Sequence, residues 1–166
     1  MRILLYIFLI SFQMIAQDIS WVNNTPIIRS YSSPRTTDLN TDGIDDVIMG
    51  GGVDGYPTPY GVIAINGLDG TTLWTVTTRN EMFTSPQFFD YTNDNIDDVL
   101  IGGRDAELRL IDGSNGEVIW EFWDDENLNP NDDGWYNFYT PQIIEDQTED
   151  GSPDILVANG GDHSLD

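Results

Sequence analysis

Three segments of the chain carry an oxygen-bearing side chain at alternate positions, a spacing suited to holding a hard cation. They are residues 38–49 (DLNTDGIDDVIM), 90–101 (DYTNDNIDDVLI) and 146–157 (DQTEDGSPDILV), and they begin 52 and 56 residues apart. Oxygen ligands at positions one, three, five and nine, with the main-chain carbonyl of position seven, form the kind of cage in which proteins bind Ca²⁺. The spacing therefore predicts three calcium loops, with Ca²⁺ as the cofactor.

The predicted ligands occupy the same five positions in each loop. They are Asp38, Asn40, Asp42, Ile44 and Asp46 in the first loop, Asp90, Thr92, Asp94, Ile96 and Asp98 in the second, and Asp146, Thr148, Asp150, Ser152 and Asp154 in the third. Gly43 and Gly151 at position six permit a sharp turn, and Asn95 tolerates the same left-handed geometry. Threonine at position three is a poorer ligand than asparagine, so we expect the first loop to bind best.

The acidic loops have two other possible interpretations. An EF-hand needs a bidentate glutamate at position twelve and flanking helices, whereas position twelve is Met49, Ile101 or Val157, each in a β-like run. The second alternative is that Asp, Asn and Gly only mark hairpin turns. Turn chemistry explains the Asp-Gly pairs but not carboxylates repeated at positions one, five and nine. Asp45 and Asp97 fall outside the ligand pattern, so we expect them either to be solvated or to lie just behind the ligands.

A second repeated element follows the first two loops and completes a four-stranded unit. Residues 64–74 (AINGLDGTTLW) parallel residues 110–120 (LIDGSNGEVIW), and each reads as strand, Gly-containing turn and strand. The second unit shows the expected strands most clearly, at residues 87–89, 98–101, 108–111 and 117–122. Four antiparallel strands per unit of about 50 residues are typical of a β-propeller blade. No segment after the N-terminus has a helical apolar period, so we expect almost no helix.

These units predict an all-β fold made of two full blades and part of a third. The expected segments are a signal peptide at 1–17, an N-terminal strand of the kind that closes a last blade at 18–32, blade one at 33–84, blade two at 85–139 with an inserted loop at 123–139, and a partial third blade at 140–166. Propellers typically have four to eight blades. We therefore expect the chain to be the N-terminal part of a larger propeller.

The first seventeen residues predict export from the cell. Arg2 precedes an apolar run at residues 3–15, which ends at Ala16 and Gln17. This run is shorter than the roughly 20 residues that span a bilayer, and it is typical of a secretory signal peptide. A buried or interfacial helix is the alternative. We expect a protein that is secreted, at the cell surface or in the periplasm, with no membrane span and, since cysteine is absent, no disulfide framework.

The charge of the chain excludes two classes of partner. Its 29 acidic and six basic residues give a formal net charge of -23. Nucleic acid and anionic membrane surfaces both require a basic footprint, so neither suits this protein. Disorder is not indicated either, because 39% of the residues are hydrophobic and 11% are aromatic.

Two resemblances join these observations. Residues 38–52 (DLNTDGIDDVIMGGG) resemble an FG-GAP repeat, the calcium-loop blade of integrin α-chain propellers and of many secreted bacterial proteins. The tryptophan-containing elements are similar to the docking motif of pyrroloquinoline-quinone-type, or quinoprotein-like, propellers. That similarity implies that Trp21, Trp74 and Trp120 pack between neighbouring blades. Both resemblances imply a propeller, and neither implies one particular activity.

The longest link between the repeated units is the expected ligand-binding segment. The loop over residues 123–139 combines acids with Trp123, Trp135 and Tyr136, a composition that suits recognition of a sugar or peptide. The alternative is that these aromatic side chains cover a blade edge. We expect a non-catalytic, calcium-binding module for adhesion or for binding an extracellular protein or glycan.

The alternative function is the propeller portion of an extracellular enzyme, either polysaccharide-active or quinoprotein-like. A quinone enzyme would need roughly eight blades around its cofactor, more than this chain supplies. Paired carboxylates for hydrolysis arise by chance in so acidic a sequence. His163 is the only histidine available for a catalytic triad, and we expect it to be a loop residue.

Overall fold

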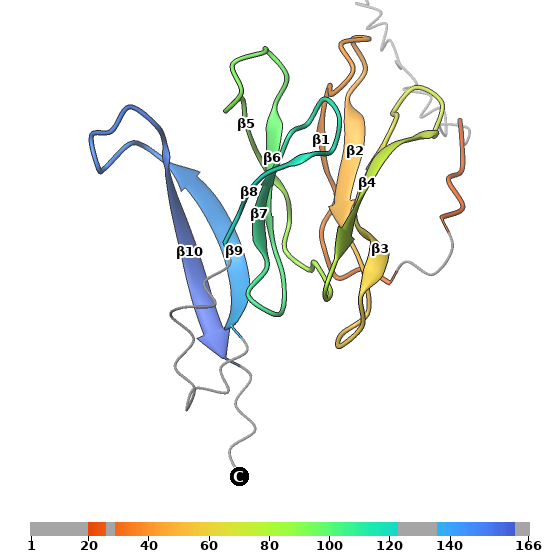
Figure 1. Cartoon of the computed structure of the whole chain (residues 1–166). Coiled ribbons are helices and arrows are strands. Elements are labelled where there is room, and N and C mark those ends of the chain that lie inside the picture. Colours follow the sequence, from red (N-terminus) through yellow and green to blue (C-terminus); the bar gives the residue numbers. More distant parts are fainter. Residues whose placement is uncertain (1–19, 26–28, 123–135, 162–166) are drawn as a thin grey trace, which may run out of the picture.

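The computed structural model describes residues 20–25, 29–122 and 136–161 (Figure 1), and all regular structure within them is β-strand. β1–β4 form one sheet, β5–β8 a second and β9–β10 a hairpin, and every neighbouring pair is antiparallel. The strands are β1 Arg35–Thr37, β2 Asp46–Gly50, β3 Thr58–Ile65, β4 Thr72–Thr78, β5 Gln87–Phe89, β6 Asp98–Gly102, β7 Leu108–Ile111, β8 Val118–Glu121, β9 Tyr136–Ile144 and β10 Asp154–Gly161.

The predicted all-β, antiparallel architecture is confirmed. In the second unit β5 and β7 have the expected bounds, β6 is one residue longer and β8 is shorter at both ends. Two segments differ from expectation. β9 begins at Tyr136, so residues 136–139 are strand rather than loop, and residues 20–25 form no strand.

The sheets follow one another in space in chain order, and Figure 1 shows them side by side. A first apolar cluster joins sheets one and two, with Ile48, Val62 and Ile101 fully buried in it. A second cluster joins sheet two to the hairpin, where Phe138 packs with Leu100. β6 is buried along its whole length because it contributes to both clusters. Its continuous apolar run is expected for a strand covered on both faces.

Main-chain hydrogen bonds repeat at the two joints between sheets. Met82 N donates to Gly51 O over 2.9 Å, and Phe138 N donates to Gly103 O over the same distance. Gly103 has no room for a side chain, since a Cβ atom there would meet the main chain of residues 81 and 82. Close packing at the joints therefore explains Gly50, Gly102 and Gly103, which follow the first two acidic repeats.

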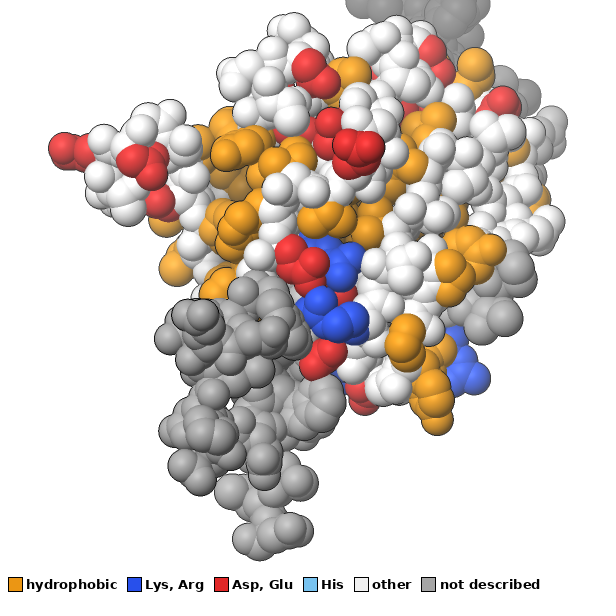
Figure 2. Space-filling view, in the orientation of Figure 1, with side chains coloured by type: hydrophobic (Ala, Val, Ile, Leu, Met, Phe, Trp, Pro, Cys, Tyr) orange, Lys and Arg blue, Asp and Glu red, His pale blue; other side chains and the backbone are white. Residues whose placement is uncertain are grey.

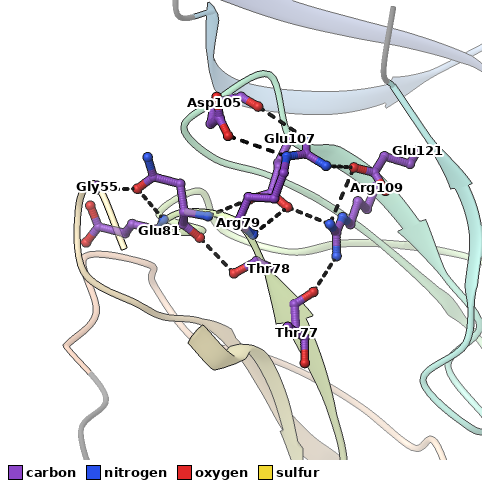
Figure 3. A network of polar contacts seen from close by, with 10 residues as sticks. Gly55, Thr77, Thr78, Arg79, Glu81, Asp105, Glu107, Arg109 and Glu121 are labelled. Atoms are coloured by element: carbon purple, nitrogen blue, oxygen red, sulfur yellow. Dashed lines mark hydrogen bonds and ion pairs between the residues drawn. The ribbon is translucent and has the colours of Figure 1, made fainter. Parts of the chain in front are cut away.

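A group of charged side chains, which we call the polar clasp, ties sheet two to the end of β4 (Figure 3). It consists of Arg79, Glu107, Arg109 and Glu121. Glu107 is fully buried and accepts main-chain hydrogen bonds from Arg79 N (3.1 Å) and Asn80 N (2.9 Å). Arg109 donates to Glu107 and, over 2.7 Å, to Thr77 O. Burial raises the pKa of Glu107, although Arg109 opposes the shift.

We predict that Arg109→Met destabilises the fold by about 3 to 5 kcal/mol at neutral pH, because it leaves the Glu107 carboxylate buried without its partner. The folded-state pKa of Glu107 already lies above 4.5, and loss of Arg109 raises it further. The carboxyl then favours folding only when protonated, so stability present below about pH 4.5 is lost as pH rises through the folded-state pKa. The deficit relative to the unmodified protein therefore grows from pH 5 to pH 8.

Urea unfolding at several pH values measures this deficit. Arg35→Met is the matched control, because Arg35 is exposed on β1. It should change the free energy of unfolding by less than about 0.5 kcal/mol at every pH. A deficit in Arg109→Met that is small, or that does not depend on pH, would contradict the role given to the clasp.

Candidate metal centres

The three acidic loops lie at the same end of the sheets. They connect β1 to β2, β5 to β6 and β9 to β10, and all three are at the upper end in Figure 1. In each loop the last predicted ligand is the first residue of the strand that follows: Asp46, Asp98 and Asp154. The sheets therefore position the loops in the same way three times.

The carboxylate at position one organises each loop by accepting main-chain hydrogen bonds from positions five and six. Asp38 accepts from Asp42 N (3.3 Å) and Gly43 N (2.9 Å). Asp90 accepts the equivalent bonds over 3.2 and 3.0 Å, and Asp146 over 3.3 and 2.8 Å. Loops of different sequence thus adopt one hydrogen-bonding pattern.

The backbone is left-handed at positions four and six of every loop. At position four φ is 60° for Thr41, 59° for Asn93 and 60° for Glu149, and at position six it is 86° for Gly43, 70° for Asn95 and 94° for Gly151. A β-branched residue such as Thr41 is strained in this region. The hydrogen bonds to the position-one carboxylate offset that strain, so the turn depends on the acid as well as on glycine.

The carboxylates at positions five and nine differ in exposure. Asp42 is exposed, and only its Oδ1 accepts a hydrogen bond from a described residue, Ile44 N at 2.8 Å. Asp46 is fully buried, and it accepts from Leu39 N and Gly67 N, each over 2.9 Å. The buried carboxylate therefore joins its own loop to the turn between β3 and β4. Asp98 makes the same connection in the second sheet, accepting from the N–H of Gly113 over 3.1 Å.

Local hydrogen bonds favour the ionised form of the position-one carboxylates. The Gly43 N–H lowers the pKa of Asp38, and the Gly151 N–H lowers the pKa of Asp146. Both side chains are therefore anionic at neutral pH, as a carboxylate ligand must be.

The side chains at the predicted ligand positions have the donor atoms that calcium prefers. Asp, Asn and Thr side chains with a main-chain carbonyl are a hard-oxygen donor set. Within the described residues, no group of three or more His, Cys, Asp or Glu side chains lies close enough to hold a metal ion as it stands. Each carboxylate has about four acceptor positions, so the main-chain hydrogen bonds leave acceptors for a cation.

Two of the three tryptophans predicted to dock make the same contact with a neighbouring turn. Trp21 Nε1 donates to Gly67 O over 2.8 Å, and Trp74 Nε1 donates to Gly113 O over 2.7 Å. Trp120 is 41% exposed, and its indole N–H donates to no described residue. The sequence showed the repeated tryptophans but not their acceptors. The glycines shared by the turns at 66–70 and 112–116 were the available signal.

The other predicted binding residues are not positioned by the structure. Trp123 and Trp135 lie outside the described residues, and Tyr136 is known only as the first residue of β9. In the parts of the chain that are described, no helix is long and apolar enough to cross a membrane.

No protein-family model matches the chain, and no curated protein matches it. The function of the protein is therefore inferred from its own loops and sheets.

Proposed function

We propose that this chain is a secreted, calcium-binding β-propeller module that binds an extracellular protein or glycan and performs no catalysis. The observation that carries the proposal is the threefold repetition of one acidic loop, with the same left-handed positions and the same hydrogen bonds around its first carboxylate. The repeats share their whole loop geometry and not only turn-forming residue types, which favours a shared ligand. The apolar N-terminal segment supports export.

The sheet arrangement supports the propeller part of the proposal. Two four-stranded antiparallel sheets and a two-stranded hairpin lie next to one another in chain order, joined by equivalent hydrogen bonds. In a propeller, neighbouring blades pack in this serial manner. The hairpin would then be the first half of a third blade.

The distribution of acids supports binding rather than catalysis. Eleven of the aspartates belong to the three loops, including Asp45 and Asp97 beside the ligand positions. Bound calcium would offset the repulsion among these carboxylates, which lie at one end of a protein of net charge -23. We therefore assign the acids to cation binding and the stability that it gives.

We predict that calcium raises the melting temperature of the full chain relative to the protein in chelator. Binding to the folded state alone stabilises it by mass action, by about 2.7 kcal/mol for a single site at calcium 100 times the dissociation constant. Differential scanning calorimetry with and without calcium measures the shift. Coincident melts at millimolar calcium would refute the calcium proposal.

Asp42→Ala sharpens the same test. Asp42 is exposed and accepts one hydrogen bond from a described residue, so its loss should alter the melt in chelator only slightly. Calorimetric titration should show one calcium site fewer. Asp45→Ala is the matched control, since Asp45 is exposed in the same loop but off the ligand pattern. Equal effects of the two substitutions would show that general charge, not ligation, is responsible.

For the binding role, we predict that replacing both Trp135 and Tyr136 with alanine abolishes recognition of the partner while the calcium-dependent melt is retained. The first step is to screen the unmodified protein against glycan arrays and surface proteins. The double variant is then measured on the hits by surface plasmon resonance. Unchanged affinity would show that the segment over residues 123–139 is not the binding surface.

A further inference from the structure

Sheet one shows how a complete unit closes around the turn between β3 and β4. The turn has the sequence Asn-Gly-Leu-Asp-Gly at residues 66–70. Gly67 N donates to Asp46 Oδ1 over 2.9 Å, and Gly67 O accepts from the indole of Trp21. Gly70 has φ of 77°, and a Cβ atom on it would come within 2.6 Å of the indole ring. Both glycines are therefore required by contacts.

Sheet two repeats every one of these contacts. Its turn, at residues 112–116, reads Asp-Gly-Ser-Asn-Gly. Gly113 N donates to Asp98 Oδ1 over 3.1 Å, and Gly113 O accepts from the indole of Trp74. Gly116 has φ of 81°, and a Cβ atom on it would lie 2.9 Å from that indole. One turn chemistry thus closes both sheets.

At the β9–β10 hairpin the equivalent carboxylate and indole are present, but no turn among the described residues binds them. Asp154 Oδ1 accepts only a long bond, 3.4 Å, from Thr148 Oγ1, where its counterparts accept a glycine N–H. The indole N–H of Trp120 is without an acceptor in the described part of the chain. Among the described residues β10 pairs only with β9, so no described strand lies along its other edge.

Burial at position two of the acidic loops shows where a third turn would pack. Leu39 is 2% exposed, and a Cβ atom on Gly113, in the turn of sheet two, would lie 2.9 Å from its side chain. Tyr91, at the same position of the second loop, is 48% exposed. A turn of the same kind on the hairpin would cover it.

An apolar groove of 290 Å³ lies between sheet two and the hairpin. Tyr91, Trp120, Ile143, Pro153 and Ile155 are among its walls. Figure 2 shows hydrophobic side chains exposed between the hairpin and the middle of the molecule. An open strand edge beside exposed apolar side chains is a surface at which another strand can add.

We propose that this groove and the edge of β10 bind a β-hairpin whose turn has the sequence Asx-Gly-x-Asx-Gly. Its first strand would pair with β10, the first turn glycine would bond Asp154 and Trp120, and the second would lie against the indole. This turn sequence occurs twice in the chain, and both copies are engaged in their own sheets. The occupant is therefore a hairpin of a partner polypeptide, since a second copy of this chain could donate one only by opening a sheet.

The test supplies the hairpin to the full chain. A copy of residues 106–122 is added after residue 166 through a flexible linker of about 20 residues. Hydrogen exchange of the β10 amides is then measured by mass spectrometry, with calcium and with chelator. Docking should slow exchange at β10 about tenfold or more, and it should do so in both solutions, because none of the contacts includes a cation. A result in chelator thus separates this proposal from the calcium proposal.

Three controls decide the outcome. An extension with both turn glycines replaced by alanine should give no protection. Trp120→Ala should abolish protection by the unaltered extension, whereas Val118→Ala, an equally exposed residue on the same strand, should not. Absence of protection, or equal protection by both extensions, overturns the proposal. So does a dimer of the unextended chain, seen by sedimentation, that already protects β10, because the occupant would then be a second copy.

Discussion

The rest of the structure depends on a buried carboxylate that must be satisfied from two directions. Asp46 and Asp98 begin the second strand of their sheets with almost no exposure to solvent. A buried charge is tolerated only when donors surround it. The acidic loop supplies one main-chain donor to Asp46 and two to Asp98, and the glycine turn across the sheet supplies one to each. Loop and turn are thereby fixed relative to each other, and the position of any cation follows from that relation.

The same turn connects each sheet to what precedes it. Its glycine carbonyl accepts an indole N–H from the previous unit, as Gly113 does from Trp74. Each unit is therefore held internally by an acid and externally by a tryptophan, and both meet at one glycine. Such a protein behaves as a series of neighbouring interfaces rather than as one undivided core. The joint beyond sheet two keeps the apolar contacts of Phe138, but within the described residues it has no tryptophan contact of this kind.

Local features were predictable because their causes are local. Asx-Gly turns and short β-branched runs marked the hairpins, and the alternating acids marked the loops. Features that depend on contacts between distant parts of the chain were not predicted. Residues 136–139 read as loop from their polar and aromatic mixture, but burial of Phe138 against sheet two makes them strand. Glu107 and Arg109 also gave no sign of burial, because the main-chain groups that they bind at the end of β4 are distant in sequence and charged residues are usually exposed.

The polar clasp has a consequence for the order of the repeats. In sheet one the places of Glu107 and Arg109 are held by Gly61 and Ile63, as the pairing of β2 with β3 and of β6 with β7 shows. Similar units can exchange partners during folding, since their surfaces are alike. A buried carboxylate and guanidinium that match only the end of β4 penalise every other neighbour. The polar clasp thus favours packing of sheet two against sheet one over packing against any other repeated unit.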